Sequence, residues 1–216
     1  MYKPFQNRRS ENLTASGDAE SIRQVPEFSP EERKILLTIA HAAITAKLAG
    51  KPLPDRTSFA PSSPGVWAAL EKPRGVFTTL YLRGELRGCV GYVAAIRPLA
   101  QAVAETACAA AFEDSRFWPV SAEEAPELKV SLSVLSPLFP IHAGQVEVGR
   151  HGLVISDGLR RGLLLPQVPV EHGWDRETFL QQTCRKAGLP LDAWKWKSAT
   201  IEAFEAEVFG EEEDSG

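Results

Sequence analysis

The amino-acid sequence predicts an α+β fold built around a mainly antiparallel sheet. Segments with strand periodicity come in pairs joined by short turns, and helical segments follow these pairs instead of alternating with single strands. This order of strands and then a helix occurs twice, which predicts one domain over residues 29–210 with two joined halves, about 29–140 and 141–210. A length of 216 residues and a hydrophobic content of 44% suit such a domain with a sizeable core.

The chain begins with a polar segment over residues 1–28, which we expect to be a mobile leader because it has few apolar residues and no periodicity. Order is predicted to begin at Ser29, which can cap a helix in which Pro30 comes first and Glu32 completes a capping box. Apolar residues at helical spacing continue this helix, and Gly50 ends it. The proline-rich segment that follows is predicted to be a loop.

A β-hairpin is predicted next. Residues 76–82 alternate between two faces, Arg83, Gly84 and Glu85 form a turn, and residues 86–93 return as the second strand. An alanine-rich helix is expected at about 98–113, where small side chains would let the helix lie close to the sheet. A third strand of the same kind is expected at 130–134.

The second half repeats this pattern. Short strands are predicted near 145–149, 152–156 and 162–166, with a turn at Asp157 and Gly158 between the last two. A helix is expected over 175–187, ended by Gly188. A final strand is expected from Thr200 to Phe209.

Charge and motif content exclude several functions. Four acidic residues in the segment 211–216 account for the formal net charge of −4, so we expect this segment to be a solvated acidic tail. The rest of the chain is neutral, which gives no support to nucleic-acid binding through overall charge. No apolar run is long enough to span a membrane, and no secretory signal is visible. The cysteines and histidines lack zinc-type spacing, and no nucleotide or hydrolase motif is present, so we predict a cytoplasmic protein with no metal and no cofactor.

The segment Leu86 to Gly91 has an unusual composition for a strand. Glycine weakens a strand and often marks a bulge or a close backbone approach, so Gly88 and Gly91 could admit a ligand. Cys89 is a candidate nucleophile, and Arg87 would favour its thiolate because residues two apart on a regular strand share a face. The alternative is a small buried cysteine beside glycines that bend the sheet.

Two further clusters carry groups that could act in binding or catalysis. Asp114 and Arg116 follow the alanine-rich helix; they could form a local ion pair, or Arg116 could present its guanidinium to a carboxylate or phosphate. His151 lies beside a glycine and could serve in acid–base catalysis, although a structural role is the alternative. The cluster of His151 also includes Gln167, from the segment 165–167, whereas the basic turn at 158–162 is interpreted as solvated.

Together these motifs resemble the AMMECR-one family, also called AmmeMemoRadiSam system protein A. Its hexapeptide Leu-Arg-Gly-Cys-Ile/Val-Gly corresponds to residues 86–91, and its Phe-x-Asp-x-Arg-Phe segment corresponds to residues 112–117. Ser115 and Trp118 stand where prolines are usual. The resemblance spans about residues 30–210 and includes four further segments, at 133–135, 148–153, 162–168 and 183–189.

The resemblance implies two β-rich repeats with paired helices that share one barrel-like sheet. It also implies an association with a Memo-like protein, related to non-haem iron dioxygenases, and with a radical SAM iron–sulfur enzyme. The family's molecular function is not established, so two hypotheses follow. In the first, the chain is an accessory or binding component that presents a cleft around the hexapeptide to these partners. In the second, it is an enzyme that uses Cys89 as a nucleophile on a small anionic substrate bound by Arg87 or Arg116.

Overall fold

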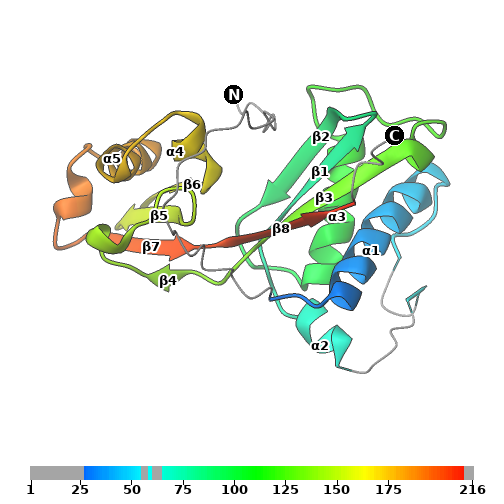
Figure 1. Cartoon of the computed structure of the whole chain (residues 1–216), viewed down its shortest axis with the longest axis horizontal. Helices are drawn as coiled ribbons and strands as arrows, with labels where there is room; N and C mark the ends of the chain where they lie inside the picture. The colour runs from blue at the N-terminus through cyan, green and yellow to red at the C-terminus, as the bar shows by residue number, and fades with distance from the viewer. Residues whose placement is uncertain (1–26, 55–57, 60–64, 212–216) are drawn as a thin grey trace, which may run out of the picture.

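The computed structural model describes residues 27–54, 58–59 and 65–211. Within these ranges the chain forms two parts, each a four-stranded antiparallel sheet with helices packed on it (Figure 1). This arrangement confirms the predicted α+β class. The predicted leader and acidic tail lie outside the described residues, apart from Glu27, Phe28 and Glu211.

The two sheets have the strand orders β2-β1-β3-β8 and β4-β7-β5-β6. Three-residue 3₁₀ turns at 125–127, 143–145 and 193–195 lie between the regular elements. In chain order these elements are α1 (Pro30–Leu48), α2 (Val66–Leu70), β1 (Val76–Leu82), β2 (Glu85–Tyr92), α3 (Leu99–Phe112), β3 (Leu128–Leu135), β4 (Phe139–Pro140), β5 (Gly152–Asp157), β6 (Arg160–Leu164), α4 (Gln167–Glu171), α5 (Arg176–Lys186), β7 (Thr200–Phe204) and β8 (Ala206–Gly210).

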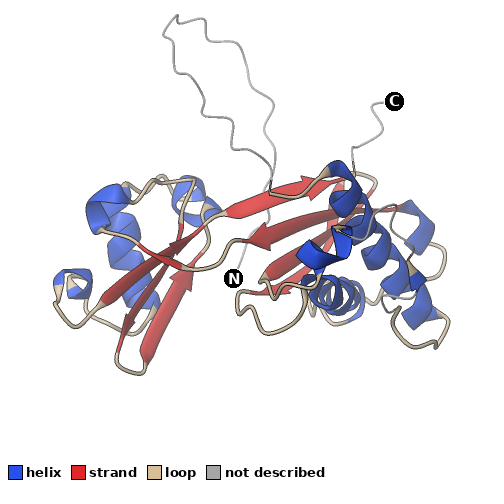
Figure 2. Cartoon of the chain, turned by 90° about the horizontal axis from the view of Figure 1, so that it is seen from below, coloured by secondary structure: helices blue, strands red, loops and turns tan. Residues whose placement is uncertain are grey.

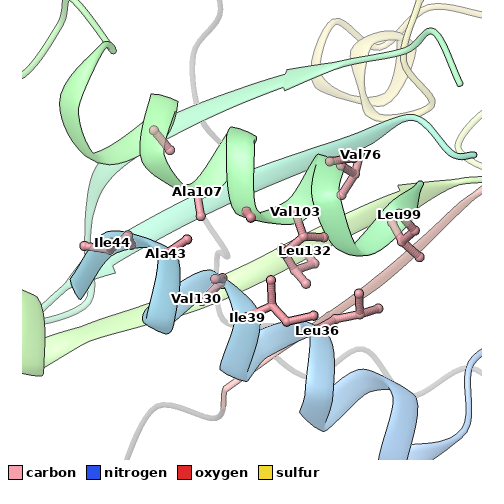
Figure 3. Packing of buried hydrophobic residues seen from close by; sticks show 14 of the residues in the cluster. Leu36, Ile39, Ala43, Ile44, Val76, Leu99, Val103, Ala107, Val130 and Leu132 are labelled. Atoms are coloured by element: carbon pink, nitrogen blue, oxygen red, sulfur yellow. The ribbon is translucent and has the colours of Figure 1, made fainter. Parts of the chain in front are cut away.

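The first helix begins where the sequence predicts. The Ser29 hydroxyl accepts a hydrogen bond from the Glu32 amide at 3.3 Å, and the Glu32 carboxylate accepts one from the Ser29 amide at 2.7 Å, so the capping box is complete. Helices α1 and α3 pack on each other and cover one face of the first sheet (Figure 1). Figure 3 shows side chains of both helices, such as Ile39 of α1 and Ala107 of α3, in one cluster with Leu132 of β3. The alanines of α3 allow this close approach.

Strand β1 divides the first sheet into two different faces. Val76, Thr78 and Leu80 are buried beneath the helices, whereas Phe77 and the residues that alternate with it are half-buried on the opposite face. The turn to β2 needs left-handed backbone at Arg83 (φ 53°) and Gly84 (φ 81°), as in a two-residue hairpin. The sheet therefore offers one face, free of helices, for a site.

Both ends of the described range are fixed to the first sheet. Phe28, which the sequence analysis placed in the leader, is buried with its ring centroid 6.2 Å from that of Phe209. The Glu211 carboxylate lies 3.0 Å from His41 Nε2 and accepts a hydrogen bond from the Val130 amide at 2.8 Å. Glu211 therefore belongs to the folded body, whereas the acidic residues after it lie outside the described residues.

The second half has the strand pairing of the first. Strand β5 pairs antiparallel with β6 and β7, as β1 pairs antiparallel with β2 and β3. In each half a glycine of the second hairpin strand lies against the backbone near the end of a later helix, α3 in the first half and α5 in the second. A Cβ on Gly88 would overlap the carbonyl oxygen of Ala110, and one on Gly162 would overlap the amide nitrogen of Ala187. Glycine at these two positions thus lets each hairpin lie directly on its helix.

The structure corrects three details of the predicted fold. Residues 145–149 form no strand, because a 3₁₀ turn and a hydrogen-bonded turn at 147–151 occupy this segment. The predicted strand over 200–209 is divided at Glu205 into β7 and β8, one in each sheet. The expectation of one barrel-like sheet, which the resemblance implied, is also wrong. The described strands form two separate open sheets, joined where β3 leads to β4 and where β7 leads to β8 (Figure 2).

None of the helices in the described ranges is long and apolar enough to cross a membrane.

Candidate functional site

A cleft lies between the helix-free face of the first sheet and the second half of the chain. Its volume is about 750 Å³, within the range of small-molecule binding sites. One wall consists of side chains from β1 and β2 and of the segment that follows α3, and the other consists of residues from β6, α4 and the end of α5. Five residues predicted from the sequence line it: Cys89, Gly91, Asp114, Arg116 and Gln167.

Asp114 and Arg116 connect the two sequence motifs of the first half. Strand β2 is at the edge of its sheet, and the Cys89 amide donates a hydrogen bond of 2.9 Å to the Asp114 carboxylate. The Arg116 guanidinium donates to the same carboxylate at 2.6 and 2.9 Å and reaches the Cys89 carbonyl oxygen at 3.4 Å. The pair therefore satisfies the outward amide and carbonyl of Cys89 as a neighbouring strand would.

This arrangement also determines the charge of Asp114. Hydrogen bonds from Arg116 lower the pKa of the Asp114 carboxyl to about 2, with a smaller contribution from the Cys89 amide, against the opposing effect of burial. The carboxylate is thus ionised at neutral pH and neutralised by its partner. The sequence allowed Arg116 either to form a local ion pair or to present its guanidinium to a ligand. The two roles are compatible in the structure, since Arg116 forms the ion pair with Asp114 and also lines the cleft.

Cys89 is the thiol of the cleft. It is half-buried, and its Sγ accepts a hydrogen bond from the Thr79 hydroxyl at 3.3 Å. Cys108 and Cys184 are buried, and burial raises the pKa of both thiols. The described residues that line the cleft include no histidine and two carboxylates: Asp114, which is held by Arg116, and Glu171 on the second wall. Neither of these two carboxylates forms a hydrogen bond with the Cys89 thiol, whose partner is Thr79.

Arg87 and Gly88 do not line the cleft. The register of the hairpin shifts where Leu80 pairs with Gly88 and Tyr81 pairs with Leu86, so Arg87 is the extra residue of a bulge. Its guanidinium binds the Glu124 carboxylate at 2.9 and 3.1 Å. The close approach that Gly88 permits is made by helix α3 and not by a ligand.

His151 also lies outside the cleft. Its side chain is buried, its Nδ1 accepts a hydrogen bond from the Glu147 amide at 3.0 Å, and its ring meets that of Phe139 edge-on. Burial and, to a smaller extent, the charge of Arg150 lower its pKa, so the ring is neutral near pH 7. These contacts are typical of a histidine packed within the fold, which favours the structural alternative for His151.

The charged residues of the second wall were not predicted from the sequence. Arg161, Glu171 and Lys186 line the cleft, although the turn that contains Arg161 was interpreted as merely solvated. A usable signal was present, because the pair Arg161-Gly162 repeats the pair Arg87-Gly88 in the second half. In the parts of the chain that the structure describes, no three His, Cys, Asp or Glu side chains gather to hold a metal ion.

Comparisons with known proteins agree with this architecture. The AMMECR1 family model matches residues 37–209. Protein MK0488 of Methanopyrus kandleri is 43% identical over 197 residues, which cover 86% of this chain and 91% of that protein. Protein MJ0810 of Methanocaldococcus jannaschii is 42% identical over 195 residues, covering 86% and 93%.

A solved structure extends the similarity to the fold. The crystal structure of the uncharacterized protein PH0010 from Pyrococcus horikoshii superimposes with a TM-score of 0.65 at 38% sequence identity, covering 88% of this chain and 96% of that one. The matched region includes both motifs of the first half and the cleft residues of the second. On this evidence the chain belongs to the AMMECR1 family.

Proposed function

We propose that this protein is a binding component that works with a Memo-like protein and a radical SAM enzyme, and that the cleft beside the hexapeptide is its recognition site. The observation that supports this function is the convergence of Cys89, Gly91, Asp114, Arg116 and Gln167 on one cavity between the two halves. Asp114 and Arg116 are bonded to each other, and Asp114 is bonded to β2. The cleft is therefore better suited to ligand binding than to acid–base catalysis by this pair.

The choice of partners rests on the family resemblance, so it needs a direct test. The full chain would be immobilised and incubated with the Memo-like and radical SAM proteins of the same organism. Gln167→Trp would fill the cleft from its second wall. Gln101→Trp introduces the same side chain on the exposed surface of α3, away from the cleft, and is the matched control. We expect the first variant to lose a partner that the wild type and the control retain; equal retention by both variants would contradict the proposal.

A second candidate function is an enzyme with Cys89 as nucleophile on a small anionic substrate. It is favoured by the half-buried thiol that faces the cleft and accepts the Thr79 hydrogen bond. The test is the rate of alkylation by iodoacetamide at neutral pH, assigned by comparing Cys89→Ser with Cys108→Ser. An enzyme predicts alkylation of Cys89 faster than that of free cysteine, whereas a slower rate favours the binding component.

A further inference from the structure

We propose that Arg161 and Lys186 form an anion-binding pair on the second wall of the cleft. The ligand would be a small organic molecule with an apolar body and one anionic group such as a carboxylate, sulfonate or phosphate. This inference rests on the proposed function, because it takes the cleft to be the recognition site.

The backbone brings the two cations to one place. Gly162 has no side chain, and its Cα lies so close to the end of α5 that a Cβ would meet the backbone of Lys186 and Ala187. Since Gly162 faces the helix, its neighbours Arg161 and Leu163 face the opposite way, and both line the cleft. Lys186, at the end of α5, lines the same cavity. The contact between β6 and α5 therefore determines the position of both charges.

Within the described residues only one of these two charges, that of Arg161, has a carboxylate partner. Lys186 forms no ion pair with another described residue, whereas Arg161 forms a loose ion pair with Glu202, in which 3.8 Å separates the guanidinium from the carboxylate, too far for a hydrogen bond. On the opposite wall Asp114 and Arg116 neutralise each other. Glu171 is the other carboxylate that lines the cleft, whereas Glu202, the partner of Arg161, does not line it. The second wall thus presents two cations and one carboxylate to the cleft, which favours an anion.

The rest of the lining indicates an apolar ligand body. Between the polar groups the walls carry aromatic and branched aliphatic side chains from both halves: Phe77, Tyr81, Leu86, Val90, Leu163 and Leu165. Small-molecule sites commonly combine such a lining with a few charged or polar groups that orient the ligand. A purely inorganic anion would leave these side chains uncovered.

Two fluorescent probes with the same rings test the inference on the full chain. Anilinonaphthalene sulfonate carries an anionic group, and N-phenylnaphthylamine lacks it. We expect the double variant Arg161→Gln/Lys186→Gln to weaken sulfonate binding by about tenfold, which corresponds to two partly exposed charge contacts, and to change the affinity for the neutral amine by less than about twofold. Protection of Cys89 from alkylation by each probe, with Cys89→Ser as reference, shows whether the probe occupies the cleft.

The matched control is Arg160→Gln/Arg185→Gln, which removes the same charge from the same two elements at residues that do not line the cleft. Equal weakening of sulfonate binding by both double variants would show a general effect of surface charge and overturn the inference. The inference also fails if the neutral amine binds as tightly as the sulfonate, or if neither probe protects Cys89. Retention of the partner proteins is measured separately, so the proposed function and the anion site can fail independently.

Discussion

Replacing Asp114 with asparagine tests whether this carboxylate joins the two motifs of the first half. Its oxygens accept hydrogen bonds from the Cys89 amide at 2.9 Å and from the Arg116 guanidinium at 2.6 and 2.9 Å. Asparagine retains one acceptor oxygen, but its NH₂ group would face either the Cys89 amide or the Arg116 guanidinium, which are both donors. The negative charge that pairs with Arg116 is also lost. We therefore expect Asp114→Asn to destabilise the folded protein and to accelerate hydrogen exchange of the Cys89 amide.

The size of the effect follows from the pKa of the carboxyl group. Hydrogen bonds from Arg116 are the main reason that the pKa of Asp114 falls from 3.8 to about 2. A shift of this size corresponds to about 2 kcal/mol of stability near neutral pH. The Asp114 side chain is only 7% exposed, but that of Arg116 is 37% exposed, so solvent screens part of the interaction. The expected loss in the free energy of unfolding is about 1–2 kcal/mol.

Urea unfolding followed by tryptophan fluorescence measures this loss, and its pH dependence identifies the cause. Because the folded-state pKa is lowered, the contribution is complete above the unfolded-state value of 3.8 and disappears as the pH falls through about 2. The difference between wild type and Asp114→Asn should therefore shrink to about half at about pH 3.

An exposed aspartate provides the control. Asp192→Asn makes the same chemical change at an exposed side chain with no capping hydrogen bond, and it should alter the free energy of unfolding by less than about 0.5 kcal/mol. The reasoning is refuted if Asp114→Asn costs no more than the control, or if its cost is the same at neutral and acidic pH.

Three other outcomes are expected. Gly88→Ala, whose Cβ would overlap the Ala110 carbonyl, should cost about 3 kcal/mol or more in urea unfolding, whereas Gly144→Ala, which meets no atom within 4 Å, should change little. Thiol titration with an aromatic disulfide should modify Cys89 in the native protein and the two buried cysteines only after unfolding. The lowered pKa of His151 predicts that the melting temperature falls as the pH drops below about 6.5, because the unfolded chain binds the proton first; His151→Gln should remove this step.

Local signals in the sequence predicted most of the first half. The Ser29 capping box, the alternation of 76–82 and the alanine-rich helix are determined by neighbours in sequence, and all three are present in the structure. Asp114 and Arg116 were recognised as a pair for the same reason, since only Ser115 separates them and a turn holds them together. Where a structural feature depends on residues close together in the sequence, composition and spacing were sufficient to predict it.

Contacts between distant residues were not predictable in this way. Residues 200–209 read as one strand because their periodicity is continuous, yet the chain passes from one sheet to the other at Glu205. At this point the Ser136 amide donates to the Glu205 carbonyl at 2.8 Å, and the Ser136 hydroxyl accepts from the Glu205 amide at 3.0 Å. The crossing is stabilised by a partner far away in the sequence, which periodicity cannot reveal. The cleft lies between the halves that this crossing connects.

The two Arg-Gly pairs show why one motif can have two roles. Gly88 and Gly162 both face a helix, so on a regular strand the arginine before each would face the cleft. In β6 the register is regular, with Arg161 opposite Ser156, and Arg161 lines the cleft. In β2 the bulge makes Arg87 an extra residue, and its side chain binds Glu124 instead. The bulge, and not the residue type, therefore directs Arg87 to Glu124, so that of the two arginines only Arg161 lines the cleft.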